Sequence, residues 1–220
     1  YTAAWTALAG MSVLMGQCDR AREIAERLHP LVDRLPVYER AQLDISMAAC
    51  QSDYGAALEA ARRAAKAEPH RAGMTGWIPL LALLENRPHE ALDAIAATGW
   101  DPFEEDPNPF GWETAAAFHM LGEHGKELKA ARLGRHFSRG DMQRLQTEVV
   151  ALAALGRVDE LEMRIEERLA QRSYQTYPVE PPDALMVRVG LELRAHGHPA
   201  EAQTFFARAV EWERGHPVEA

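Results

Sequence analysis

The sequence lacks the short motifs that usually indicate enzyme chemistry. It has no glycine-rich phosphate loop, no GxSxG or SxxK nucleophile motif and no HExxH metal motif. Paired acids such as Glu104 and Glu105 have no candidate catalytic partner nearby in the sequence. Catalysis therefore has no support, and we predict that the protein is not an enzyme and needs no cofactor.

Cysteine is also scarce, because only Cys18 and Cys50 are present and neither belongs to a CxxC pair. Two thiols do not make a disulfide framework, which favours a reducing compartment. We interpret both as small buried side chains and expect a cytoplasmic protein. The uncharged residues 1–18 lack a basic flank and fall short of the ~20 residues of a membrane span, so we expect a repeat helix there. Since the chain begins at Tyr1, we expect a piece of a longer protein.

Positive charge is not in excess. The 24 Lys and Arg residues are outnumbered by 33 Asp and Glu residues, which gives a formal net charge of −9. A surface that binds nucleic acid is usually basic. This balance therefore argues against nucleic acid as a partner, and nothing in the sequence calls for a membrane.

Small turn residues, in contrast, recur at a nearly constant spacing. They lie 36, 34, 36, 34 and 41 residues apart, at Gly16, Ser52, Asn86, Gly122, Gly156 and Gly197. Ala and Leu dominate between them and β-branched residues are sparse, which favours helix. A period near 34 residues is typical of stacked helical hairpins.

Each turn separates two helical patterns, and together they predict twelve helices. The expected ranges are 2–15, 19–34, 37–51, 53–67, 73–86, 88–97, 110–122, 124–137, 141–155, 157–170, 183–196 and 199–214. Two proline-rich stretches, 99–110 and 172–182, are expected to be long loops between repeats. We predict one all-α domain over 1–220, a right-handed α-solenoid of about six hairpins.

Aligned by their turns, the hairpins resemble tetratricopeptide repeats (TPRs). That family has a small residue five positions after the turn, where two helices cross closely. The corresponding residues here are Ala21, Ala57, Ala91, Glu127, Leu161 and Ala202. The segments LPVYERAQLD, SDYGAALEAARRAAKAEP and LENRPHEALDAI are also similar to TPR modules of bacterial serine/threonine kinases and winged-helix transcriptional regulators. The resemblance implies an accessory regulatory module.

The TPR resemblance implies a concave groove lined by the first helix of each hairpin. The residues expected there are Glu39, Gln42, Ser46, Leu80, Trp112, His119, Gln143, Gln146 and Arg194. This mixture of polar and apolar side chains suits a peptide or a neighbouring domain. Alternatively, these side chains are solvated or pack against the next repeat.

The loop at 99–110 carries the aromatic residues Trp100, Phe103 and Phe110, with Trp112 just beyond. Exposed aromatic residues beside acids are typical of interfaces. The same rings could instead fill the gap between the third and fourth repeats.

Charged residues and histidines offer weaker signals. Basic residues from Lys126 to Arg139 and acidic residues from Asp159 to Glu167 are expected to pair between neighbouring helices. Nine histidines suggest metal binding, and His119 and His124 lie close together in the sequence. No set of ligands has a recognisable spacing, so we predict no metal site.

The sequence therefore favours a scaffold that binds a protein, a peptide or its own effector domain. One alternative is a homodimer formed through exposed apolar residues of the last helix, namely Phe205, Val210 and Trp212. Another is a small-molecule sensor in which Trp77, Trp100 and Trp112 converge on one cavity.

Overall fold

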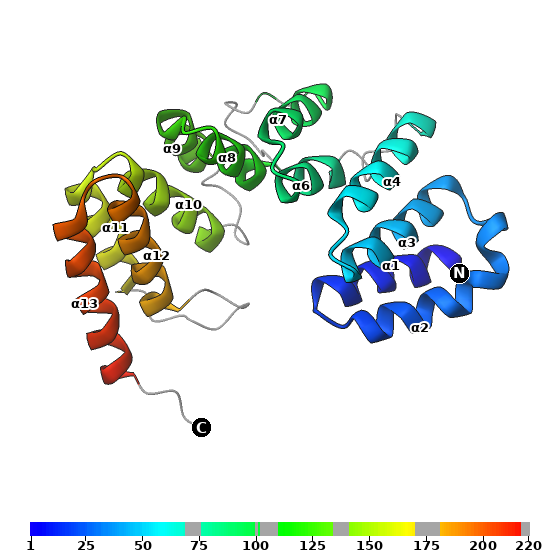
Figure 1. Cartoon of the computed structure of the whole chain (residues 1–220), viewed down its shortest axis with the longest axis horizontal. Helices are drawn as coiled ribbons and strands as arrows, with labels where there is room; N and C mark the ends of the chain where they lie inside the picture. Colours follow the sequence, from blue (N-terminus) through cyan, green and yellow to red (C-terminus); the bar gives the residue numbers. More distant parts are fainter. Residues whose placement is uncertain (69–75, 100, 102–109, 134–140, 170–180, 217–220) are drawn as a thin grey trace. The chain divides into compact units, whose positions relative to one another are not determined.

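The computed structural model describes residues 1–68, 76–99, 101, 110–133, 141–169 and 181–216. Every regular element in these ranges is helical, and none is a strand. The chain divides into two compact units, Tyr1–Trp100 and Asp101–Ala220. The predicted all-α solenoid class is confirmed, since each unit is a stack of helical hairpins (Figure 1).

Unit 1 contains three hairpins. They are α1 (Thr2–Leu14) with α2 (Cys18–Leu28), α3 (Val37–Cys50) with α4 (Tyr54–Ala67), and α6 (Trp77–Leu84) with α7 (Pro88–Ala97). Helix α3 packs against α1 as well as against its own partner α4, and α4 in turn packs against α6. The apolar core beneath α1, α2 and α3 consists of Ala9, Ile24, Leu28, Leu35 and Leu43.

Unit 2 repeats this arrangement. Its hairpins are α8 (Gly111–Met120) with α9 (His124–Leu133), α10 (Asp141–Ala154) with α11 (Val158–Leu169), and α12 (Pro182–Ala195) with α13 (Pro199–Gly215). Helix α10 lies between α8 and α12 and packs against both. Val149, Leu152, Leu161, Val189 and Phe205 are fully buried in its core.

All six predicted turns have the same backbone geometry. The residue at each has a positive φ, between 56° at Asn86 and 88° at Gly197. Its N–H donates a hydrogen bond to the carbonyl oxygen three residues earlier. The N–H of the following residue donates to the carbonyl oxygen five residues before it. At the first turn these bonds are Gly16 to Val13, 2.9 Å, and Gln17 to Ser12, 2.8 Å. This pair of hydrogen bonds is the Schellman motif, which ends a helix and redirects the chain.

The position five residues after each turn is buried in every hairpin. The alanines found there in four hairpins, together with Leu161 and Glu127, are at most 1% exposed. The close crossing of two helices expected from the TPR resemblance is therefore present throughout. Glu127 is the exceptional member, because it brings a carboxylate into an interior position.

Helix 19–34 is shorter than predicted. The α-helix α2 ends at Leu28, and residues His29–Arg34 form a 3₁₀ segment, η1. Pro30 lies in the first turn of η1 and has no N–H to donate, so it cannot continue the α-helical bonding. Arg40 then bonds through two of its guanidinium nitrogens to the carbonyl oxygen of Val32, at 3.2 and 2.7 Å, which fixes this segment against α3.

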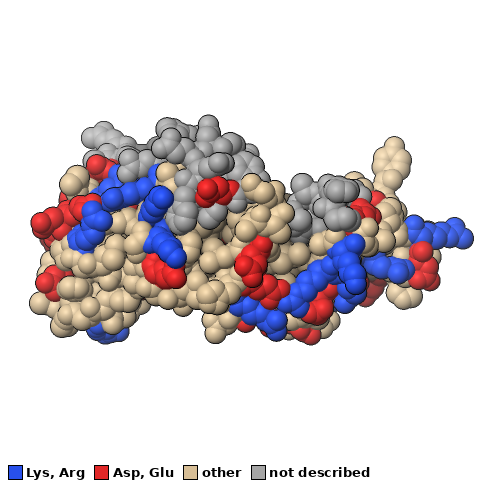
Figure 2. Space-filling model, turned by 90° about the horizontal axis from the view of Figure 1, so that it is seen from above, with Lys and Arg blue, Asp and Glu red and all other residues tan. Residues whose placement is uncertain are grey.

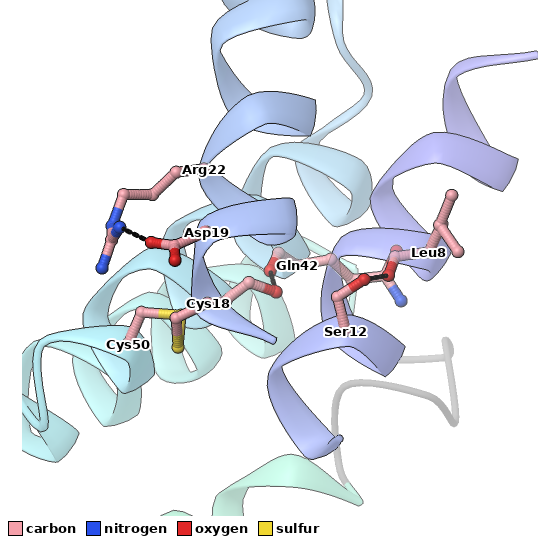
Figure 3. Close-up of a disulfide and its surroundings, with 8 residues drawn as sticks. Leu8, Ser12, Cys18, Asp19, Arg22, Gln42 and Cys50 are labelled. Atoms are coloured by element: carbon pink, nitrogen blue, oxygen red, sulfur yellow. Dashed lines mark hydrogen bonds and ion pairs between the residues drawn. A yellow bond between two sulfur atoms is a disulfide. The ribbon is translucent and has the colours of Figure 1, made fainter. Parts of the chain in front are cut away.

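The interpretation of Cys18 and Cys50 as separate thiols is wrong. The two form a disulfide with a Cα–Cα distance of 5.6 Å. Figure 3 shows that it joins the start of α2 to the end of α3. The turns bring these residues together because Cys18 lies two residues after one turn residue and Cys50 two residues before the next. The bond therefore links two successive hairpins of unit 1.

One of the expected charge pairs between neighbouring helices joins Arg132 and Glu160 in unit 2. Arg132 of α9 bonds to Glu160 of α11 at 2.8 Å. Its Nε also bonds to Glu148 of α10 at 2.9 Å, and Arg164 of α11 bonds to the other oxygen of the same carboxylate at 3.1 Å. Glu148 is only 3% exposed, so these two arginines compensate the burial of its charge.

Within the residues that the structure describes, no helix combines the length and the apolar character needed to cross a membrane.

Substitutions at the turn residues test the energetic cost of their positive φ angles. Ser52 has a φ of 57°, so Ser52→Gly should raise the free energy of unfolding by about 1 kcal/mol. Gly122 has a φ of +70° and open space where a Cβ would lie. Gly122→Ala should therefore lower the stability by about 1 kcal/mol through backbone strain alone. Urea unfolding followed by circular dichroism measures both changes.

Gly125 provides the matched control for these turn substitutions. It lies in α9, also has open space around it, and does not have a positive φ. Gly125→Ala should leave the stability unchanged or raise it, because Ala favours helix. Equal losses at Gly122 and Gly125 would show that the turn geometry is not the cause.

The disulfide generates a second test. It closes a loop with a sequence separation of 32 residues. In the chain-entropy description, such a loop stabilises the folded state by roughly 3–4 kcal/mol. Reduction of the wild type should therefore move the urea midpoint of unit 1 downward and speed amide exchange in α2 and α3. The Cys18→Ala/Cys50→Ala variant should start at the lower midpoint and not respond to reductant; a response would mean that reductant acts elsewhere.

Candidate functional site

Three of the residues predicted to line the groove lie on α3 in unit 1. Gln42 accepts a hydrogen bond from Thr6 Oγ1 of α1 at 3.0 Å and donates to the Tyr38 hydroxyl at 3.2 Å. Ser46 donates to the backbone oxygen of Gln42 at 2.7 Å. Ser46 and Glu39 are buried, and the Oε2 atom of Glu39 has no hydrogen-bond partner. Gln42 is thus engaged with α1, and the binding role of all three residues stays a prediction.

The predicted groove residues of unit 2 come from three first helices. Trp112 of α8 is 36% exposed, while Gln146 of α10 is partly buried. Arg194 at the end of α12 is exposed, and its guanidinium lies over the ring of Phe206, 5.7 Å from the centroid. The side chain of Gln143 lies outside the described residues. Trp112 is therefore the exposed aromatic residue among the predicted groove residues of unit 2.

The aromatic loop is described only at its end. Trp100 and Phe103 lie outside the described residues, whereas Phe110, which precedes α8, is buried. Burial of Phe110 agrees with the interpretation that a ring from this loop fills space beside the hairpin.

The prediction that Phe205 is an exposed apolar residue of the last helix is wrong. That ring is fully buried in the core of unit 2, because it faces α12 and not solvent. Trp212 also packs against this core and stacks on His216 with ring centroids 4.2 Å apart. Only Val210 of the three is well exposed, at 47%.

A polar cluster surrounds His119, the one predicted groove residue of α8 that makes charged contacts. Its Nδ1 atom lies 3.1 Å from both carboxylate oxygens of Glu127. The Nδ1 atom of His124 lies 2.9 Å from Oε2 of the same carboxylate. The pKa of His119 is raised, chiefly by its hydrogen bond to Glu127, which outweighs the opposing effect of burial.

The last hairpin of unit 2 completes this cluster. Glu192 of α12 lies 3.7 Å from Nε2 of His119 and 2.9 Å from Nε2 of His196. The ring of His196 also contacts that of His124 edge-on, with centroids 4.7 Å apart. Residues of α8, α9 and α12 therefore meet at one place, although the α10–α11 hairpin separates the α8–α9 and α12–α13 hairpins in sequence.

Sequence reasoning placed His119 in the groove but missed its partners. The spacing of His119, His124 and Glu127 matches no known ligand motif. The available signal was Glu127 itself, which occupies a position where four other hairpins have Ala. A charged residue at a close helix crossing requires compensating partners, and this requirement could have directed attention to the nearby histidines.

Comparison with known proteins supports the fold. No protein-family model matches the chain, and no curated protein matches it. Among solved structures, the crystal structure of MamA, a TPR-like helical protein, is similar with a TM-score of 0.55. The match covers 78% of this chain and 95% of the MamA chain at 15% sequence identity. At this identity the likeness shows the fold alone, which is a TPR-like stack of helical hairpins.

Proposed function

We propose that this chain is a non-catalytic scaffold that binds a protein or peptide segment through the first helices of its hairpins. The observation that carries the proposal is the exposure of Trp112 on α8, within a TPR-like fold. Tryptophan dominates binding energy at interfaces because it buries a large rigid surface. The first helix α12 of the same unit also exposes Val187 and Leu191, at 41% and 47%.

Rigidity is the physical advantage of such a scaffold. Each hairpin is fixed by a Schellman turn, and unit 1 has a disulfide in addition. A surface that is already ordered loses little conformational entropy when a partner binds. In a larger bacterial signalling or transcription protein, binding would shift the equilibrium of the accompanying effector domain.

The charge distribution favours a protein partner over nucleic acid. The chain carries a formal net charge of −9. On the face shown in Figure 2, the described Lys and Arg residues gather in a band with Asp and Glu residues beside it, so this face is not a continuous basic field. Binding to nucleic acid depends on such a field.

The predicted cytoplasmic location remains a prediction. The disulfide between Cys18 and Cys50 weighs against it, because disulfides persist mainly in oxidising compartments.

A combinatorial peptide library displayed on phage tests the proposed binding face. Peptides selected on the wild-type chain should lose at least about fivefold in affinity for Trp112→Ala, since truncation of an interface anchor removes more than about 1 kcal/mol. Fluorescence anisotropy with the selected peptide measures the change. Met163→Ala is the control, because Met163 is 56% exposed on a second helix, α11.

Two results would contradict the proposal. One is selection of no peptide by the folded wild type, and the other is equal affinity of the Trp112 and Met163 variants. The homodimer alternative makes a different prediction. It requires a mass in light scattering that grows with concentration and falls on Val210→Glu.

A further inference from the structure

The hairpin formed by α8 and α9 differs from the other five at three aligned positions. Three residues before the turn it has His119, and the others have Val13, Ala49, Leu83, Ala153 and Arg194. Two residues after the turn it has His124, and the others have Cys18, Tyr54, Pro88, Val158 and Pro199. Five residues after the turn it has Glu127, and the others have Ala or Leu. No other hairpin has a histidine or a carboxylate at any of these positions.

Packing alone does not require a carboxylate at position 127. Glu127 is 1% exposed at a position that alanine fills in four hairpins. A buried carboxylate is strongly unfavourable unless charged or hydrogen-bonding groups surround it. The two imidazoles supply that compensation, so the three residues form one hydrogen-bonded cluster.

The three side chains present their donor atoms to one another. One donor atom from each of His119, His124 and Glu127 lies within 4.8 Å of the other two. In a tetrahedral zinc site, neighbouring donor atoms lie about 3.3 Å apart. The two imidazole nitrogens lie 3.1 and 2.9 Å from the Glu127 carboxylate, which is close to this spacing.

We propose that His119, His124 and Glu127 bind a divalent transition-metal ion, with zinc as the species best matched to two imidazoles and one carboxylate. Two nitrogen donors argue against Mg²⁺ and Ca²⁺, which prefer oxygen ligands. The absence of sulfur from the set argues against Cu⁺. Water would supply the remaining coordination position, as in other zinc sites with three protein ligands.

A carboxylate from the last hairpin faces one of the three candidate ligands. A metal-bound histidine usually hydrogen-bonds through its other ring nitrogen to a carboxylate. The Nε2 atom of His119 faces Glu192 at 3.7 Å, and Glu192 is itself held by His196 at 2.9 Å. The His119 side chain is 33% exposed and that of His124 is 13% exposed, which gives an ion access from solvent on the His119 side.

Metal binding would have a structural consequence in unit 2. The three ligands tie α8 to α9, and Glu192 connects them to α12 of the last hairpin. The ion would therefore fix the first hairpin of this unit against the last, across the intervening α10–α11 hairpin.

Isothermal titration with ZnCl₂ after chelator treatment tests the site in the intact chain. The wild type should bind one zinc ion with micromolar or tighter affinity. His124→Ala and Glu127→Ala should abolish this binding. Glu127→Ala should still fold, since it restores the alanine found in four other hairpins, and circular dichroism verifies this.

Matched variants separate the site from nonspecific histidine binding. His89→Ala removes an exposed histidine of unit 1 and should leave the affinity unchanged. Glu192→Gln should weaken binding by about 10- to 100-fold, as expected when the carboxylate beside a metal-binding histidine loses its charge. Zinc should also raise the melting temperature of the wild type but not of Glu127→Ala.

Cobalt gives a spectroscopic test of the geometry. Tetrahedral Co²⁺ with nitrogen and oxygen ligands absorbs visible light strongly, and this band should appear in the wild type and be absent from His124→Ala. The inference would be overturned if the wild type bound no zinc in the micromolar range. It would also be overturned if folded Glu127→Ala and His124→Ala retained wild-type affinity, since the cluster would then be only an internal ion pair.

Discussion

The left-handed turn at the end of each first helix is the constraint on which the structure depends. A residue with positive φ lets two successive N–H groups bond back to the helix, which closes it and reverses the chain. The second helix must then cross the first closely, so the position five residues later is buried in every hairpin. Each hairpin follows from this geometry, and the first two turns also place Cys18 and Cys50 close to successive corners of the stack.

Burial of charge is the second organising feature, and it is concentrated in unit 2. Glu148 receives two arginines from neighbouring helices, while Glu127 receives two histidines. The two carboxylates are buried to a similar degree, but their partners differ in chemistry. Arginine stays protonated and completes a permanent ion pair, whereas imidazole can lose its proton and bind a metal. The arginine partners of Glu148 therefore suit packing between helices, whereas the histidine partners of Glu127 suit a metal-binding site.

Local signals were sufficient to predict the hairpins. Turn residues, prolines and the period near 34 residues depend on contacts close in sequence, and the structure confirms twelve helices in the described residues. The difference at residues 29–34 is also local, because Pro30 has no N–H with which to continue the α-helical bonding. The groove was harder to predict. A helical pattern shows which face is polar, but it did not show that Gln42 would bond to Thr6 of the preceding hairpin.

The sequence by itself determined the fold class, the positions of the turns and the small residues at helix crossings, since each reflects the conformational preference of one residue or a short segment. Tertiary structure alone decided which distant side chains meet. It joined Cys18 to Cys50 and brought Glu192 and His196 to His119 and His124, across an intervening hairpin. Such contacts depend on the angles at which successive helices cross. Those angles arise from the packing of all the side chains between them, and no short stretch of sequence specifies them.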